Sequence, residues 1–144
     1  METNSILREK IDRNAKYIWF HASSLGEFEQ GRPMIEKIKA EHPEYKVLLT
    51  FFSPSGYEVR KNYKGADVIC YLPFDTPFRV KKFLNLANPA IAIFIKYEFW
   101  GTICVSCGSG EYRFISFPLY SAPTSYFSNG SESRTGRCYL ILII

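Results

Sequence analysis

The sequence predicts an α/β fold with an open parallel β-sheet, and three observations support this prediction. Apolar runs typical of strands alternate with amphipathic runs typical of helices over residues 5–101. Short segments that contain Pro, Gly or Ser separate these runs. The run from Lys46 to Phe52 is almost entirely apolar, as expected for a parallel strand that helices cover on both faces. This alternation over short loops indicates parallel strands joined by right-handed crossovers.

Each predicted element has its own pattern of apolar residues. An opening helix carries one apolar edge, formed by Ile6, Leu7 and Ile11. The strands are predicted over Tyr17–His21, Lys46–Phe52, Val68–Leu72 and Ala90–Ile95. The remaining helices are predicted over Phe28–His42, from Tyr57 to about Tyr63, and over Phe78–Leu86.

Proline and glycine mark the boundaries of these elements. His42 precedes Pro43 and should end its helix, because the residue before a proline disfavours helical backbone. The segment SPSG, from Ser53 to Gly56, predicts a turn. The segment Pro73–Pro77 is predicted to cap the last helix.

Length, composition and charge narrow the class of protein. The 144 residues amount to one domain, and 47% hydrophobic with 17% aromatic content is typical of a globular protein. The net charge of +4 suits an anionic substrate or membrane surface, and no nucleic-acid-binding motif occurs. No apolar run approaches the ~20 residues of a membrane span. The charged opening segment does not resemble a signal peptide.

The cysteines do not form a recognisable metal or redox site. Cys70 lies in an apolar run, which predicts a buried free thiol. Cys104 and Cys107 form a C-x-x-C, but a zinc ribbon needs a second such pair. A thioredoxin-type site needs a preceding strand and a following helix, which the pattern here does not provide. We therefore expect neither a metal nor a cofactor.

Residues 102–144 have a different composition. They contain eight serines and no lysine, whereas the first 101 residues contain five serines and ten lysines. No helical or alternating period is sustained, which predicts an irregular tail. Read in a shifted frame, the codons permit a helix, an apolar strand and a loop. We interpret residues 1–101 as a partial domain and residues 102–144 as an out-of-frame tail that is not a domain.

The main candidate site is the stretch WFHASSLGEFEQGRP, which predicts a strand, a tight loop and a helix start. Such loops lie at the carboxyl edge of a parallel sheet, where α/β proteins bind their ligands. Ser24 and Glu27 have the spacing of a capping box, so a structural role is an equal alternative to a catalytic one. Gly26 would let the backbone turn tightly or approach a ligand. The start of a helix also favours an anion.

Three other segments offer candidate residues. Glu98, in KYEFW, follows the last predicted strand, with an exposed carboxylate paired to a lysine as the alternative. Asp75, in YLPFD, either contributes to a site or caps the helix that follows. Ser55 and Gly56 in SPSG could hydrogen-bond sugars or phosphates.

Two basic clusters and one histidine have less specific patterns. The clusters consist of Arg60, Lys61 and Lys64, and of Arg79, Lys81 and Lys82. Such runs are usually solvated helix faces, with contact to anionic lipid headgroups as the alternative. His21 ends the first predicted strand and is expected to be structural rather than catalytic.

The phrases HASSLGEFEQGRP, YLPFDTP and KYEFWG occur in this order over about residues 14–101 and resemble the 3-deoxy-D-manno-octulosonic acid (Kdo) transferases. The resemblance implies a two-domain, Rossmann-like glycosyltransferase of GT-B architecture. It implies transfer of Kdo from CMP-Kdo to a lipid A precursor (lipid IVA) in lipopolysaccharide core biosynthesis. By this resemblance Glu27 is the base of an inverting transfer, and Glu98 shapes the same cleft. The implied substrate-binding residues are Ser24, Gly26, Ser55, Gly56 and Asp75.

The resemblance also implies action at the cytoplasmic face of the inner membrane, against an anionic membrane surface. Compared with the family pattern, we expect this chain to lack both the amino-terminal anchor and the domain that binds CMP-Kdo. We therefore expect an acceptor-binding fragment, cytoplasmic or peripheral, that is inactive alone because it cannot position the donor.

Two alternatives belong to other classes of protein. One is a non-catalytic module that binds phosphorylated lipid or another anionic ligand through the loop of Gly26 and the basic helices. The other is a receiver-like regulatory domain, which needs an acidic pair after the first strand. His21-Ala22-Ser23 stands there instead, so this alternative is weaker.

Overall fold

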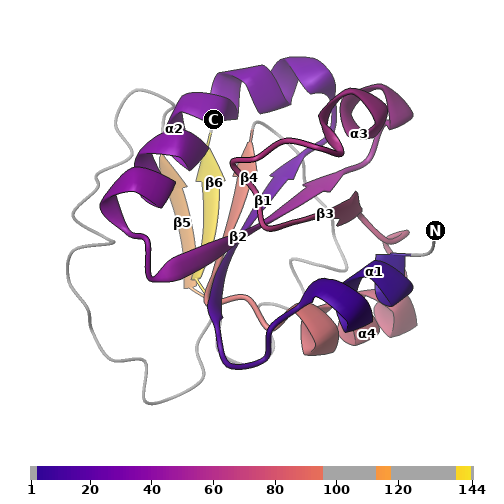
Figure 1. The fold of residues 1–144 in the computed structure, drawn as a ribbon. Helices are drawn as coiled ribbons and strands as arrows, with labels where there is room; N and C mark the ends of the chain where they lie inside the picture. Colours follow the sequence, from indigo (N-terminus) through magenta and orange to yellow (C-terminus); the bar gives the residue numbers. More distant parts are fainter. Residues whose placement is uncertain (1–2, 96–112, 118–138, 144) are drawn as a thin grey trace.

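The computed structural model describes residues 3–95, 113–117 and 139–143 (Figure 1). These residues form one parallel sheet with the strand order β3-β2-β1-β4-β6-β5. The strands are β1 (Lys16–Ala22), β2 (Tyr45–Phe51), β3 (Val68–Tyr71), β4 (Ile91–Ile95), β5 (Arg113–Phe117) and β6 (Tyr139–Ile143). The helices are α1 (Thr3–Lys10), α2 (Leu25–Glu41), α3 (Pro54–Arg60) and α4 (Pro77–Ala87).

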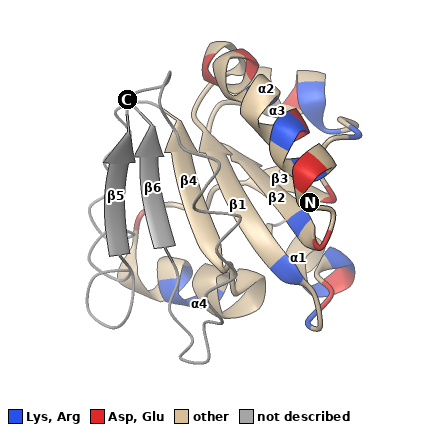
Figure 2. Cartoon of the chain, turned by 90° about the vertical axis from the view of Figure 1, so that its left-hand side faces the viewer, with Lys and Arg blue, Asp and Glu red and all other residues tan. Residues whose placement is uncertain are grey.

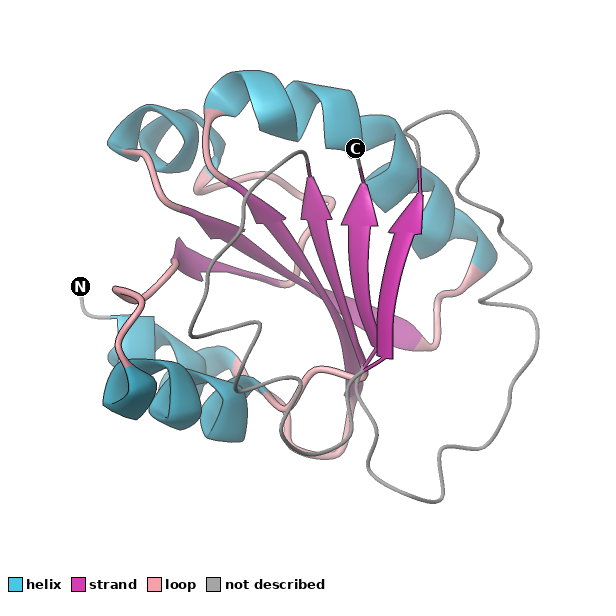
Figure 3. Cartoon of the chain, turned by 180° about the vertical axis from the view of Figure 1, so that it is seen from behind, coloured by secondary structure: helices cyan, strands magenta, loops and turns pink. Residues whose placement is uncertain are grey.

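The predicted Rossmann-like open parallel sheet is confirmed, and α2 and α3 cover one of its faces while α1 and α4 cover the other (Figures 1 and 3). The strands of the first 95 residues lie within one or two residues of their predicted bounds. Their apolar runs are buried on both faces, as a helix-covered parallel sheet requires.

The structure differs from the sequence analysis at residues 53–56. The segment predicted as a turn is the start of α3, which begins at Pro54. Proline fits the first turn of a helix because its missing N–H would have no intrahelical acceptor there. Ser53 caps this helix, and its side chain accepts a hydrogen bond from the Ser55 N–H at 3.3 Å.

The structure also differs in the segment predicted as an irregular tail. Residues 113–117 and 139–143 form β5 and β6, and both extend the sheet in parallel beside β4. The segments RFISF and YLILI are rich in aromatic and branched apolar residues, which favour strands. Each segment is only five residues long, which is too short to show a sustained alternation of apolar and polar residues. The out-of-frame origin of residues 102–144 stays a prediction.

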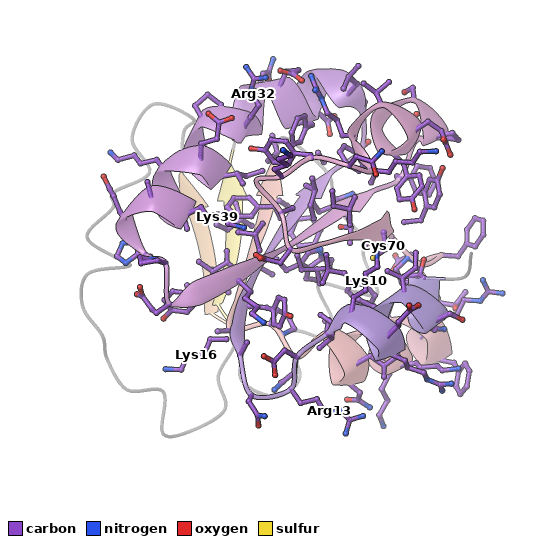
Figure 4. All side chains as sticks on the ribbon, viewed as in Figure 1. Lys10, Arg13, Lys16, Arg32, Lys39 and Cys70 are labelled. Carbon is purple, nitrogen blue, oxygen red and sulfur yellow. The ribbon has the colours of Figure 1, made fainter. Side chains whose placement is uncertain are left out.

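The core on the α1 and α4 face is built around Trp19. Its ring lies 4.9 Å from that of Phe83 and 5.1 Å from that of Phe94, centroid to centroid. Cys70, labelled in Figure 4, belongs to the same core, and the predicted buried free thiol is confirmed. Burial raises the pKa of the Cys70 thiol to about 12, so the unreactive thiol form prevails at neutral pH.

The core on the other face depends on a close approach of α2 to β4 at Gly31. A Cβ at this position would collide with Cδ1 of Ile95, whose side chain is buried. We predict that Gly31→Ala lowers the free energy of unfolding by about 1 kcal/mol, because the clash outweighs the gain in helix propensity. In the Gly31→Ala background, Ile95→Val removes the clashing methyl group and should restore part of the loss. Urea denaturation of the four proteins of this double-mutant cycle measures the coupling, and additive effects would contradict it.

Candidate functional site

The loop between β1 and α2 is closed by the side chains of Ser24 and Glu27. Ser24 is the N-cap of α2, and its Oγ accepts a hydrogen bond from the Glu27 N–H at 3.4 Å. The Glu27 Oε2 atom accepts one from the Ser23 N–H at 2.7 Å. Two hydrogen bonds therefore close the loop, as in a capping box. The Glu27 carboxylate, however, accepts from the N–H of Ser23, one residue before the N-cap Ser24, and not from that of Ser24 itself. Glu27 is held in place while remaining partly exposed.

This loop lies where a ligand is expected in an open α/β sheet. Strand β1 pairs with β2 on one side and with β4 on the other, and the chain crosses from one half of the sheet to the other between β3 and β4. The carboxyl ends of β1 and β4 therefore flank the point at which the strand order reverses. Ligands of such sheets bind in the crevice outside these ends.

A second loop, between β2 and α3, is attached to the first. The Ser53 N–H donates to the Ser23 carbonyl at 2.9 Å, and the hydroxyls of Ser53 and Ser55 lie 2.8 Å apart. Ser55 is exposed, whereas Gly56 is buried. A Cβ on Gly56 would collide with the Phe51 ring and lie 3.3 Å from the Leu25 amide nitrogen. Gly56 therefore has a packing role that brings the two loops together, and its contact with substrate stays a prediction.

Gly26 lies in the first turn of α2 and is exposed. Its backbone does not have the positive φ that would require glycine, and a Cβ there would come no closer than 4.0 Å to its nearest neighbour, Ser24 Oγ. The expectation that Gly26 serves a tight turn is therefore wrong. The other expectation, that its bare backbone lets a ligand approach, stays a prediction.

We predict opposite effects of Gly26→Ala on stability and on binding. Alanine should raise the free energy of unfolding by up to about 1 kcal/mol, because it loses less backbone entropy in a helix. The added methyl group should weaken binding of the acceptor proposed below. Thermal denaturation and titration calorimetry on the same variant measure both effects, and unchanged acceptor affinity would rule out close approach of a ligand to Gly26.

His21 and Thr50 form a buried polar group directly beneath the loop. The Trp19 indole N–H donates to Thr50 Oγ1 at 2.8 Å, and His21 Nδ1 lies 3.0 Å from the same oxygen. Burial lowers the pKa of His21 to about 3, against a smaller opposing effect of its hydrogen bond to Thr50. A neutral, buried imidazole fits the structural role predicted for His21. Sequence reasoning missed Thr50, because a threonine within an apolar strand carries no distinct signal.

The remaining predicted residues are placed differently. Asp75 lies in the loop between β3 and α4, but the N-cap of α4 is Thr76, so the capping alternative for Asp75 is wrong. Its neighbour Phe74 lines a pocket of about 530 Å³ beside α4. Glu98 lies outside the described residues. Strand β4 ends at Ile95, three residues before Glu98 in the sequence. Because β4 is parallel to β1, Ile95 lies at the same edge of the sheet as the start of α2 with Glu27.

The part of the chain that the structure describes shows neither a metal site nor a membrane span. Within it, no three His, Cys, Asp or Glu side chains gather closely enough to hold a metal ion. Similarly, none of its helices has the length and apolar character needed to cross a bilayer.

Comparison with known proteins shows which family this chain belongs to. Residues 3–117 match the family model of the 3-deoxy-D-manno-octulosonic-acid transferases (kdotransferases). The chain is 37% identical over 99 residues to the 3-deoxy-D-manno-octulosonic acid transferase of Aquifex aeolicus, which covers 68% of this chain and 27% of that protein. It is 33% identical over 84 residues to the enzyme of the same name from Haemophilus influenzae, which covers 58% of this chain and 20% of that protein.

The match covers most of this chain but only part of its relatives. The chain spans about a quarter of the length of the Aquifex protein and a fifth of the Haemophilus protein. The family match also extends past Gly101, through β5. Because the family model matches most of its length, the chain belongs to the Kdo transferase family of glycosyltransferases.

Proposed function

We propose that this chain forms the acceptor-binding side of an inverting GT-B glycosyltransferase that transfers Kdo from CMP-Kdo to a lipid A precursor. The observation that carries the proposal is the position of Glu27. Its carboxylate is oriented by the Ser23 N–H and is partly exposed in the first turn of α2, at the carboxyl edge of the sheet. Lipopolysaccharide core biosynthesis at the cytoplasmic face of the inner membrane is the proposed setting.

In the proposed reaction, Glu27 acts as general base. Its Oε2 accepts a hydrogen bond from the Ser23 N–H, which orients the carboxylate. Oε1 accepts the proton of the acceptor hydroxyl as that oxygen attacks the anomeric carbon of Kdo. The bond between this carbon and the CMP phosphate oxygen breaks, and CMP leaves with the electron pair. Inversion follows because the base and the departing nucleotide lie on opposite faces of the sugar.

The loop also suits a phosphorylated acceptor. The first N–H groups of a helix have no acceptor within the helix and attract anions. At the start of α2 they include the exposed backbone of Gly26, and the hydroxyl of Ser55 lies in the first turn of α3, whose N-cap Ser53 is hydrogen-bonded to Ser23. We propose that these groups hold the acceptor, while Asp75 and Glu98 border the same cleft. Contacts to CMP-Kdo are assigned to the parts of the relatives that this chain does not match.

A chimera tests the proposed function. Residues 3–95 replace the matching segment of the Aquifex relative, and the product is incubated with CMP-Kdo and lipid IVA. Mass spectrometry should detect acceptor carrying Kdo, whereas the 144-residue chain assayed by itself should bind acceptor and yield no product. A folded chimera that binds acceptor but never transfers Kdo would contradict the proposal and favour the non-catalytic binding module.

A further inference from the structure

The first turn of α2, which carries Glu27, has a long hydrogen bond at its cap. The Glu27 N–H donates to Ser24 Oγ at 3.4 Å, beyond the roughly 2.7–3.2 Å that is typical of N–H···O bonds. The first N–H groups of a helix have no acceptor within it, and helix ends open at little cost in free energy. A side chain that must be held precisely in this turn therefore benefits from contacts outside α2.

The start of α3 supplies two such contacts, both before Glu27 in the sequence. The Ser53 N–H donates to the Ser23 carbonyl at 2.9 Å. The backbone of Gly56 lies so close to α2 that a Cβ there would be 3.3 Å from the Leu25 amide nitrogen. These contacts fix the chain where it enters α2.

Arg60, in the last turn of α3, contacts the two residues that follow Glu27. Its guanidinium group forms an ion pair with Glu29, and its guanidinium carbon lies 5.5 Å from the centre of the Phe28 ring. This distance is within the range of a cation–π contact. The sequence presents Arg60 only as part of a basic cluster, whereas the structure places its side chain against α2. Helix α3 thus holds α2 on both sides of Glu27.

The ring of Phe28 is the fixed point of this arrangement. It is fully buried, and its centroid lies 5.6 Å from that of Phe51 and 5.1 Å from that of Tyr63. Because Phe28 adjoins Glu27 in the chain, a shift of this ring would move the carboxylate as well. Arg60 adds a charged contact to the aromatic cluster and connects it to the ion pair on α2.

Arg32 offers an internal comparison, because it also pairs with Glu29. Its Nη1 atom lies 3.3 Å from Glu29 Oε2, and its Nε atom lies 3.7 Å from Glu36 Oε1. Both partners belong to α2, on which Figure 4 labels Arg32, so these pairs stay within one helix. Figure 2 shows the acidic and basic residues of α2 and α3 close together. Of the two arginines that pair with Glu29, Arg60 connects two helices and Arg32 does not.

We propose that Arg60 is a positioning residue for the carboxylate of Glu27. By holding Phe28 and Glu29 against α3, it keeps the first turn of α2 closed and Glu27 bound to the Ser23 N–H. Residues two apart on a helix do not face each other, so Arg60 acts through the backbone and not through its charge on Glu27. The inference rests on the proposed function, in which Glu27 is the base, and a small displacement of a catalytic group lowers the rate strongly.

Amide hydrogen exchange of the 144-residue chain tests the positioning without any substrate. The Ser23 N–H donates to Glu27 Oε2, so its protection reports how firmly the carboxylate is held. Arg60→Gln should speed exchange of this amide about threefold or more, whereas Arg32→Gln should leave it unchanged. Amides of the buried strands, such as that of Leu48, should keep their exchange rates. Equal acceleration of those amides would show general destabilisation and overturn the positioning role.

The kinetic test uses the chimera that carries residues 3–95. Arg60→Gln should lower kcat about tenfold and change the KM for lipid IVA by less than about twofold. Arg60→Lys retains a charge for Glu29 but not the planar fork, so it should recover part of the loss. The matched control is Lys39→Gln, which removes an ion pair of 3.1 Å with Asp67 near the other end of α2. Lys39 lies roughly 18 Å along the helix from Glu27, so this variant should keep the unmodified kcat.

Two kinetic results would contradict the role of Arg60. One is an equal fall of kcat in Arg60→Gln and Lys39→Gln, and the other is a loss confined to KM. An unmodified chimera without activity contradicts the proposed function, whereas an active chimera whose kcat does not depend on Arg60 contradicts only the positioning role. The exchange measurement needs no sugar donor and tests Arg60 in either case.

Discussion

Glu27→Gln is expected to lower the rate of Kdo transfer by the chimera about 10²–10⁴-fold, the usual effect of removing a general base. The glutamine side-chain carbonyl can still accept the hydrogen bond that Glu27 Oε2 receives from the Ser23 N–H at 2.7 Å. The loop and its cap therefore stay in place, and only the ability to take up a proton is lost. Initial rates at saturating CMP-Kdo, together with acceptor binding by calorimetry, measure the effect.

Two further variants make this prediction specific. Glu36→Gln removes a carboxylate from an exposed position on the same helix and should leave the rate unchanged. Glu27→Asp retains a base with a shorter reach and should give an intermediate rate. If Glu27→Gln lowers acceptor affinity and stability while turnover of the bound complex is unchanged, the role of Glu27 is capping alone.

Acidification from about pH 7.5 to pH 5 is expected to lower the free energy of unfolding by about 2 kcal/mol through His21 alone. Burial lowers the folded-state pKa of this imidazole to about 3 from its ordinary value of 6.5. Between these values the unfolded chain binds a proton that the folded chain does not. The stability contributed by the neutral histidine is thus complete above its unfolded pKa and is lost progressively as the pH falls.

Urea denaturation at several pH values measures this loss. His21→Gln should be less stable at neutral pH, but its stability should change less between pH 7.5 and pH 5. The lowered pKa of Asp12, caused first by its hydrogen bond from the Asn14 N–H, acts at lower pH than this window. An unchanged slope in His21→Gln would contradict the assignment.

The sequence was sufficient to predict the fold of the first 95 residues because its strands are strongly apolar and its helices are amphipathic. It was insufficient where short segments acquire structure from their surroundings. Residues 113–117 and 139–143 form strands by pairing with β4 and with each other, which only the assembled sheet makes possible. The start of α3 was missed because SPSG fits a turn and a capped helix equally well.

The candidate site was predictable to a similar extent. The S-x-x-E spacing correctly indicated that Ser24 and Glu27 share the start of a helix, but not that the carboxylate would bind Ser23. Gly56 belongs to a motif, yet its burial against Phe51 depends on packing between elements distant in sequence. The exposure of Phe74 and Phe78 could not be read from the sequence either, because an aromatic residue beside a helix start is as compatible with a core as with a surface.

The measurement that most directly tests the central claim is an NMR titration of the isotope-labelled 144-residue chain with deacylated lipid A precursor. The account predicts that the largest amide shift changes fall on residues 23–27 and on Ser55, at the joined starts of α2 and α3. It also predicts that Gly26→Ala reduces these changes. Changes confined to other surfaces, or no changes at saturating ligand, would contradict the assignment of this edge of the sheet as the acceptor site.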